Sequence, residues 1–337
     1  MSCATPFAGR TGSTAPRIRG TTLIEVLVAL ALATLVMGTV ALVFAGTSRN
    51  RGDLERGARM NENAQSALDL LGDELRVAGY FSEVSFVGVA WQTPDPCATA
   101  TASQGWSSAP FTAPVGLVGY RRDEAVPACL AQRRAGTAAV VIRRTSVDVT
   151  PIAQASGAPF VQVSKCALDP KPWVVSDRPA DFTLRNLDCA TAADVRQLLV
   201  RTYYVADCDD CASDTVPTLK RAELVGPDIV VTPLVEGVEN LQLQYGFDGD
   251  GDGNPDRWLD RPDPTLGPAY GDWSNVMSVR LYALVRANDV QAGYVDATKT
   301  FNLGPAGYTT VANDAFRRVQ LSSIVRLNNA AGQRETP

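Results

Sequence analysis

The fold is decided by one stretch near the start of the chain, TTLIEVLVALALATLVMGTVALVFAG, which runs from Thr21 to Gly46. Its only ionisable side chain is Glu25. As an α-helix rising roughly 1.5 Å per residue, the stretch would be about 39 Å long, more than the ~30 Å hydrocarbon core of a bilayer. We therefore expect a membrane-spanning helix over residues 21–46.

The residues before this stretch indicate its orientation. Arg10, Arg17 and Arg19 precede it, and no acidic residue accompanies them. Because basic flanks stay on the cytoplasmic side of a membrane, the N-terminus should be cytoplasmic and the body of the chain exported.

Two ordinary interpretations leave Glu25 unexplained. Val43-Phe44-Ala45 could end a secretory signal, but the apolar region would exceed the usual ~7–15 residues and carry a carboxylate near its start. A plain membrane anchor gives no reason to bury Glu25, at a cost on the order of 2.5 kcal/mol or more.

A third interpretation explains the carboxylate. Gly20 followed by Thr-Thr-Leu-Ile-Glu resembles the site of prepilin peptidase. This resemblance implies cleavage between Gly20 and Thr21 and N-methylation of Thr21. Glu25 would be the fifth residue of the mature chain and would meet the N-terminal amine of a neighbouring subunit, so that both charges are neutralised. One departure is visible, since mature pilins commonly begin with phenylalanine and this chain would begin with Thr21.

Composition argues against catalysis and nucleic-acid binding. The chain has 337 residues, 45% of them hydrophobic and 20% charged, which suits a large globular head behind the anchor. Its formal net charge is −5, and it contains no histidine, the usual general base. It also lacks a nucleotide loop and a nucleophile elbow, so we expect no enzyme and no nucleic-acid partner.

The helical pattern continues beyond the membrane segment and carries a closer family resemblance. Apolar and small residues recur at threes and fours, on one helical face: Leu54, Ala58, Asn61, Ala64, Leu68, Leu71, Leu75 and Ala78. The run RMNENAQSALDLLGDELRVAGYF, from Arg59 to Phe81, closely resembles the end of the long helix in PilW-type minor pilins. Gly79 is the expected helix terminator.

The resemblance returns near the C-terminus. Residues 238–246 alternate as a strand, with Leu241, Leu243 and Tyr245 on one face. Further strands are expected over residues 276–285 and 317–329. The resemblance covers about residues 20–81 and 235–329, whereas residues 82–200 match no family.

The resemblance implies a type IV pilin-like α+β fold, in which a long N-terminal helix packs on an antiparallel β-sheet head with large insertions. The expected parts are a leader (1–20), a transmembrane and polymerisation helix (21–46), the amphipathic second half of that helix (47–79) and a β-rich periplasmic head (80–337). The implied location is the bacterial inner membrane, as a single-pass protein, and then the pilus at the cell surface.

The implied function is that of a minor pilin, which primes the type IV pilus with other minor pilins and is located near its tip. The implied partners are other minor pilins, the major pilin, prepilin peptidase and the inner-membrane assembly platform. The J-type pseudopilin of type II secretion shares this plan and remains an alternative. A second alternative is a calcium-dependent binding head on a pilin stalk, with its ligand site in residues 82–200.

An acidic loop follows the strand over residues 238–246 and resembles the first half of an EF-hand loop. We expect it to bind Ca²⁺ through Asp248, Asp250, Asp252, Asn254 and Asp256. The twelfth position is Leu259 instead of the bidentate glutamate, with Asp260 and Asp263 as other candidates, and Pro255 argues against flanking helices. The competing interpretation is a solvated hairpin turn. Calcium is favoured because four carboxylates with no nearby lysine would repel one another.

The cysteines indicate disulfides. Of the seven, Cys3 would leave with the leader, and six remain: Cys97, Cys129, Cys166, Cys189, Cys208 and Cys211. Cys208-Asp-Asp-Cys211 follows a strand-like run, and its two acids disfavour a thiolate, which argues against redox chemistry. No second such motif exists, which argues against a structural zinc site. A structural disulfide is therefore favoured. The other four cysteines allow three pairings, and proximity favours Cys97–Cys129 and Cys166–Cys189.

Overall fold

The computed structural model describes residues 20–83, 86, 88–291, 293–295, 299–304, 308–310 and 314–334. Apart from Gly20, the expected leader, with its arginines and Cys3, lies outside the described residues. Contacts divide the chain into two compact units, one up to Glu55 and one from Arg56 onward. Each unit is described by itself.

Two α-helices and sixteen strands make up the described secondary structure. The helices are α1 (Leu23–Arg76) and α2 (Asn328–Gly332). The strands are β1 (Ala90–Gln92), β2 (Ser107–Ser108), β3 (Phe111–Pro114), β4 (Leu117–Tyr120), β5 (Ala139–Thr145), β6 (Phe160–Val163), β7 (Trp173–Ser176), β8 (Val195–Ala206), β9 (Thr218–Val225), β10 (Asp228–Glu236), β11 (Val238–Phe247), β12 (Arg257–Leu259), β13 (Val276–Arg286), β14 (Thr300–Asn302), β15 (Tyr308–Thr310) and β16 (Arg318–Arg326). Short 3-10 helices are η1 (Thr101–Ser103), η2 (Ile152–Gln154), η3 (Pro179–Asp181), η4 (Pro264–Leu266), η5 (Pro268–Tyr270) and η6 (Trp273–Asn275).

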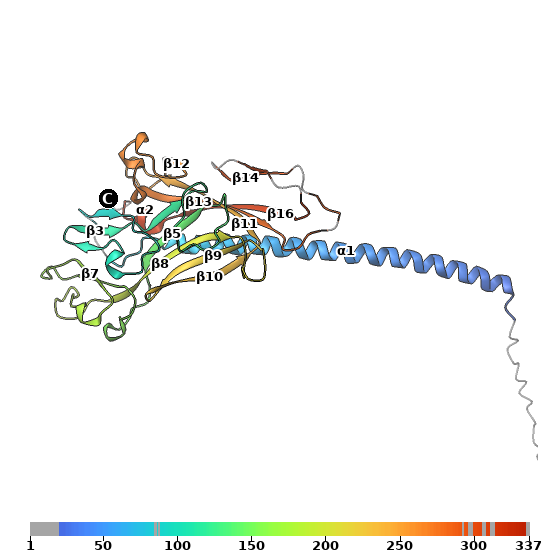
Figure 1. Cartoon of the computed structure of the whole chain (residues 1–337), viewed down its shortest axis with the longest axis horizontal. Helices are drawn as coiled ribbons and strands as arrows, with labels where there is room; N and C mark the ends of the chain where they lie inside the picture. The colour runs from blue at the N-terminus through green and yellow to red at the C-terminus, as the bar shows by residue number, and fades with distance from the viewer. Residues whose placement is uncertain are drawn as a thin grey trace, which may run out of the picture. The chain divides into compact units, whose positions relative to one another are not determined.

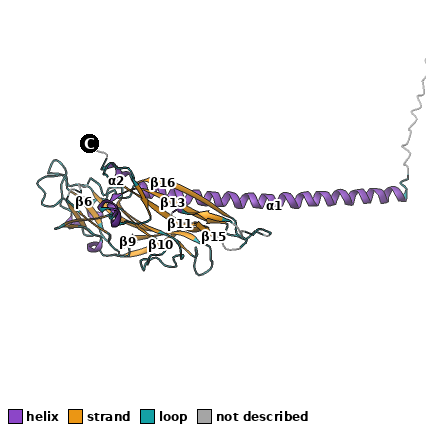
Figure 2. Ribbon diagram, turned by 90° about the horizontal axis from the view of Figure 1, so that it is seen from above, coloured by secondary structure: helices purple, strands orange, loops and turns teal. Residues whose placement is uncertain are grey.

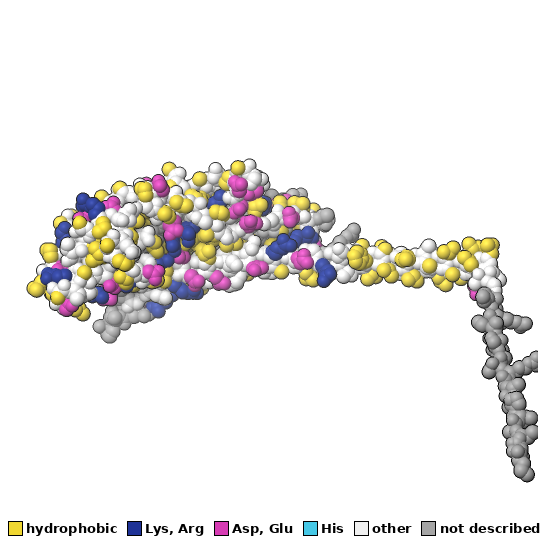
Figure 3. Space-filling view, turned by 90° about the horizontal axis from the view of Figure 1, so that it is seen from below, with side chains coloured by type: hydrophobic (Ala, Val, Ile, Leu, Met, Phe, Trp, Pro, Cys, Tyr) yellow, Lys and Arg dark blue, Asp and Glu magenta, His cyan; other side chains and the backbone are white. Residues whose placement is uncertain are grey.

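The first unit consists of the N-terminal part of α1, which begins at Leu23. Every residue from 20 to 48 is exposed, and hydrophobic side chains cover the visible face of this part of the helix (Figure 3). By length and composition, α1 is the one helix among the described residues that could cross a membrane. An apolar surface of this extent needs lipid or other helices around it.

The second unit contains the rest of α1, from Arg56 to Arg76. The predicted buried face is confirmed from Ala64 to Ala78, but Leu54 is 73% exposed, and Ala58 and Asn61 are also exposed. The buried face of α1 therefore starts further along the helix than the periodicity predicted.

A glycine ends α1, as predicted. After Arg76 the chain makes a turn, and Gly79 takes a φ of +72°, which residues with a Cβ rarely adopt. Its N–H donates to the carbonyl of Arg143 at 3.0 Å. The helix end is thereby joined to β5.

Two antiparallel sheets pack with this part of α1 (Figures 1 and 2). One has the strand order β10-β9-β8-β5-β4, with β6 and β7 attached to β8, and the other has the order β12-β11-β13-β16. The predicted α+β fold is thus confirmed. The strand predicted over 317–329 is shorter than expected, because β16 ends at Arg326 and Asn328 already begins α2.

Alternation along the strands separates two cores. In β8, Tyr203 and Val205 face the main core beside α1, whereas Leu198 and Val200 face a second core on the other side of the sheet. Leu241, Leu243 and Tyr245 of β11 all lie in the main core, as their spacing predicted.

The second core is built largely from residues 82–200, which the family resemblance does not cover. Two tryptophans from this region pack edge-to-face against their neighbours. The ring centroids of Trp106 and Phe81 are 5.1 Å apart, and those of Trp106 and Trp173 are 5.8 Å apart. These tryptophans are therefore packing residues.

A cluster of charged side chains joins α1 to the larger sheet. Glu74 accepts hydrogen bonds from Arg144 of β5 at 3.2 Å and from Arg201 of β8 at 2.6 Å. Arg201 also donates to Glu223 of β9 at 2.7 Å. The side chains of all four are at most 16% exposed. This cluster fixes which face of the helix meets the sheet.

Candidate assembly site and acidic loop

The expected assembly residues lie at the start of α1. Gly20 and Thr21 are exposed and precede the helix. Glu25 is also exposed and lies in the first helical turn. Its backbone N–H donates to the carbonyl of Thr22 at 3.1 Å and approaches the Thr22 hydroxyl at 3.4 Å.

Thr22 therefore caps the helix, a role that the sequence analysis missed. The signal was present, since Thr-Leu-Ile-Glu fits the capping-box pattern of Ser or Thr followed three residues later by Glu or Gln. A carboxylate in the first turn also interacts favourably with the helix dipole. Glu25 thus has a local role in starting the helix. A test of assembly has to separate this role from the effect of its negative charge on a neighbouring subunit.

The acidic loop joins β11 to β12 and is organised around one buried carboxylate. Asp248 is 1% exposed and accepts backbone N–H groups from Gly251 at 2.6 Å and Gly253 at 2.9 Å. Both glycines have positive φ, +88° and +83°, which explains the alternation of aspartate and glycine. The loop wraps around Asp248.

Arg334 provides a cation that the sequence did not predict. Its guanidinium lies 2.9 Å from the carboxylate of Asp248 and also donates to Asn275. Burial alone would raise the pKa of Asp248, but the two glycine N–H groups and Arg334 together hold it below the ordinary value. The repulsion on which the calcium expectation rested is therefore weaker than predicted, because a residue 86 positions away pairs with one of the carboxylates.

Three carboxylates of the loop come together. One oxygen each from Asp248, Asp250 and Asp256 can lie within 4.8 Å of the others, close enough to hold a metal ion. Asp252 is outside this group and accepts the backbone N–H of Asn254 at 2.7 Å.

The two more distant candidates are engaged elsewhere. Asp260 pairs with Arg121 at 3.3 Å, and Asp263 accepts the backbone N–H of Thr265 at 3.0 Å, at the start of η4. The loop thus offers an aspartate triad that could bind a metal, instead of the EF-hand register read from the sequence.

The structure forms three disulfides. They are Cys97–Cys129, Cys166–Cys189 and Cys208–Cys211, the pairs that sequence proximity favoured. Cys208–Cys211 lies in the turn between β8 and β9, where a local bridge was expected. Such bridges suit an exported protein.

Together, a long apolar N-terminal helix and antiparallel sheets packed on its second half define a type IV pilin-like protein. Residues 202–329 match the model of PilW, described as type IV pilus-assembly protein W. The predicted resemblance to PilW proteins is thereby confirmed. The model's description is that of a pilus-assembly protein, and the match supports the expectation of a structural protein rather than an enzyme.

Other comparisons give more distant similarity. A type IV-like pilin from Thermus thermophilus has 12% sequence identity and a TM-score of 0.38, over 81% of this chain and 97% of that one. No curated protein matches.

Proposed function

We propose that the protein is a minor pilin, which joins other minor pilins in the inner membrane and primes the type IV pilus near its future tip. The observation that carries this proposal is the fully exposed apolar surface of residues 20–48, with Glu25 as its acidic group. The PilW match over residues 202–329 supports a role in pilus assembly.

The proposed mechanism begins with removal of the leader. Prepilin peptidase cuts after Gly20, and the new amine of Thr21 is methylated. Glu25 of one subunit then meets the amine of its neighbour, which removes two charges from the apolar phase as subunits leave the membrane. Residues 21–46 polymerise, residues 47–79 support the head, and residues 80–337 choose lateral neighbours among the major and minor pilins. The assembly platform of the inner membrane drives extraction.

The test separates the charge of Glu25 from its role in helix initiation. Glu25→Gln keeps the capping box, because glutamine can replace glutamate at this position, but it removes the charge. Thr22→Ala keeps the charge and removes the cap. We expect Glu25→Gln to abolish surface pili and Thr22→Ala to preserve most of them, with both proteins present in the membrane at wild-type amounts. Normal piliation in Glu25→Gln would contradict the proposal.

The J-type pseudopilin of type II secretion remains the alternative, because it shares the plan of the fold. The PilW match favours the pilus. A deletion strain should therefore lose surface pili and twitching while its secreted enzymes still leave the cell. Loss of secretion with normal pili would support the pseudopilin instead.

We also propose that the acidic loop binds Ca²⁺. Calcium prefers six to eight oxygen ligands, and Asp248, Asp250 and Asp256 can supply the first three. Asp252, the carbonyl of Asn254 and water would be the remaining donors. Bound calcium would share Asp248 with Arg334.

Thermal unfolding of the head measures this binding. At a calcium concentration 100 times the Kd, the expected stabilisation is about 2.7 kcal/mol, and EGTA should remove it. Asp250→Asn together with Asp256→Asn should abolish the calcium effect. Asp252→Asn, which removes one charge outside the triad, should retain most of it. An equal loss in both variants would contradict the triad, and no response to EGTA in the wild type would contradict calcium binding.

A further inference from the structure

The turn between β8 and β9 holds a disulfide whose two sulfurs differ in environment. We propose that Cys208–Cys211 exchanges electrons with an external dithiol, so that this turn is a redox-responsive site on the head. Cys208 is 5% exposed, whereas Cys211 lies on the surface. Cys211 is therefore the residue of the pair that faces solvent, and we take its sulfur as the one that an external thiol attacks. This inference is independent of the proposed role in pilus assembly.

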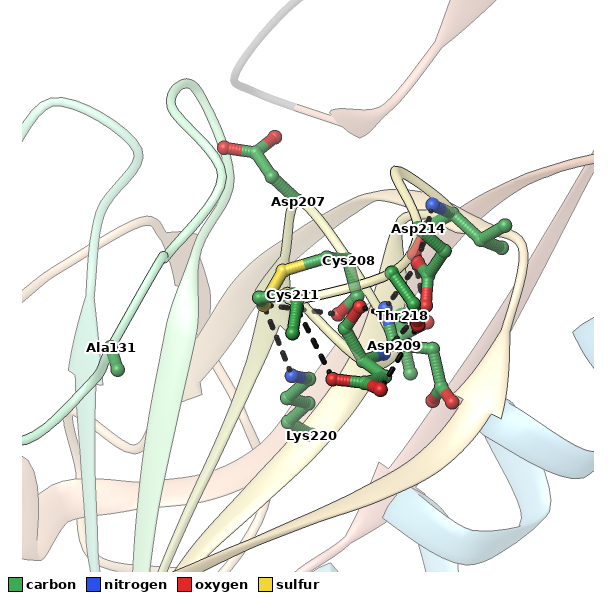
Figure 4. Close-up of a disulfide and its surroundings, with 12 residues drawn as sticks. Ala131, Asp207, Cys208, Asp209, Cys211, Asp214, Thr218 and Lys220 are labelled. Carbon is green, nitrogen blue, oxygen red and sulfur yellow. Dashed lines mark hydrogen bonds between the residues drawn. A yellow bond between two sulfur atoms is a disulfide. The ribbon is translucent and has the colours of Figure 1, made fainter.

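A buried lysine lies beside the accessible sulfur. Lys220 of β9 is 6% exposed, and its Nζ is 3.7 Å from the Sγ of Cys211 (Figure 4). Lys220 forms no salt bridge with a described carboxylate, but its charge adds to the backbone N–H groups of Val216 and Asp209 in holding the pKa of Asp214 below the ordinary value. A cation at this position stabilises the thiolate form of a cysteine. The two acids between the cysteines destabilise a thiolate by charge repulsion, and the positive charge of Lys220 counteracts this repulsion.

The carboxylate of Asp210 is engaged within the turn itself. It accepts the backbone N–H of Ala212 at 3.2 Å and the hydroxyl of Ser213 at 2.9 Å. These bonds spread the negative charge of Asp210 over the turn, while Lys220 faces the sulfur.

Hydrogen bonds also hold the turn in shape, in addition to its disulfide. The carboxylate of Asp214 accepts backbone N–H groups from Asp209 at 2.9 Å, Asp210 at 2.6 Å and Val216 at 2.9 Å. The carbonyl of Thr215 accepts from Arg286 of β13 at 3.1 Å. These bonds keep the two cysteines and Lys220 together after reduction, so that the disulfide can form again.

Loop length also distinguishes this disulfide from the other two. Its cysteines are 3 positions apart, compared with 32 for Cys97–Cys129 and 23 for Cys166–Cys189. A short loop restricts the unfolded chain least, so reducing it destabilises the fold least. The longer bridges hold the fold, and the short one is free to exchange.

The exchange balances in two steps. A thiolate of the external dithiol attacks Sγ of Cys211, the Cys208–Cys211 bond breaks, and its electron pair remains on Cys208, which takes up a proton. The second external thiolate then attacks its partner sulfur in the mixed disulfide and releases Cys211 as a thiolate beside Lys220. Two electrons pass to the protein, and the external dithiol becomes a disulfide. Oxidation reverses these steps, with Cys211 as the nucleophile.

The test uses the full-length protein in detergent, dithiothreitol as the dithiol, and alkylation with mass mapping of the six cysteines that form disulfides. We expect Cys208 and Cys211 to be reduced at least about tenfold faster than the other four, with the protein still folded. If the three disulfides are reduced at equal rates, or only upon unfolding, the proposal is overturned.

Variants test the role of Lys220. Lys220→Met should slow reduction of Cys208–Cys211 about fivefold or more, and Lys220→Arg should restore the rate because it restores the cation. Lys171→Met, which removes a lysine from the loop between Cys166 and Cys189, is the matched control and should leave the rate unchanged. Equal rates in Lys220→Met and Lys171→Met would overturn the role of Lys220. If Lys220→Met does not fold, the comparison of Lys220→Arg with the wild type still tests the role of the charge. Slower reduction of Cys208–Cys211 in Lys220→Arg would contradict that role.

Discussion

Glu74 offers a quantitative test of how α1 is held against the head. Its carboxylate contacts Arg144 and Arg201, and all three side chains are at most 16% exposed. Glu74→Ala would leave two poorly solvated guanidinium groups without this partner. Breaking a buried pair costs ~3–5 kcal/mol, and because Arg201 keeps Glu223, we expect the lower end, about 3 kcal/mol.

This cost corresponds to a measurable shift in melting temperature. The second unit, from Arg56 to Pro337, has roughly 280 residues, so its unfolding entropy is about 0.6 kcal/mol per kelvin and the expected fall in Tm is about 5 °C. The assay is thermal unfolding of this unit, followed by circular dichroism. Adding Arg144→Met to Glu74→Ala should recover part of the loss, because one unpaired cation is removed.

The matched control is the neighbouring residue. Asp73 also forms an ion pair, with Arg76 at 2.5 Å, but its side chain is 76% exposed. Asp73→Ala should therefore cost less than about 1 kcal/mol. If Glu74→Ala and Asp73→Ala lower the Tm equally, burial of the Glu74 cluster does not control its contribution, and the reasoning fails.

Two further predictions concern packing and pH. Gly119→Ala should destabilise the head by about 1–3 kcal/mol in urea denaturation, because a Cβ there would overlap the hydroxyl of buried Tyr245. Gly72→Ala, in α1, should instead stabilise the head by ~0.5–1 kcal/mol, because its Cβ would lie 3.6 Å from the nearest side-chain atom. Effects of the same sign in the two variants would contradict this account. The lowered pKa of Asp248 contributes stability above its unfolded-state pKa of about 3.9, and this contribution is lost as the pH falls below that value. In EGTA, the stability difference between wild type and Asp248→Asn should therefore shrink from pH 6 to pH 3, and a constant difference would contradict the assignment.

Local patterns predicted the elements of the fold well. The alternation of Leu241, Leu243 and Tyr245 specified a buried strand face, because a strand shows its period within a few residues. The helical period was less reliable at its start. Leu54 matches the period but is exposed, since periodicity does not reveal where the sheets that cover a helix begin.

The candidate sites show the limits of local patterns more clearly. The loop around Asp248 was found from its spacing, but its partner Arg334 could not be, because no pattern links residues so far apart. Lys220 beside Cys211 is a similar case, in which strand pairing brings a distant charge to a motif. In both places a cation from a distant part of the sequence lies beside a motif that the sequence had identified.

The position of residues 327–334 has a consequence for the order of folding. Asn329 donates to the carbonyl of Ala78 at 3.2 Å, Leu327 and Ala331 are buried, and Arg334 neutralises Asp248. Until residues 327–334 are in place, the end of α1 and the acidic loop lack these partners. The head can therefore complete its folding only once this late part of the chain is available.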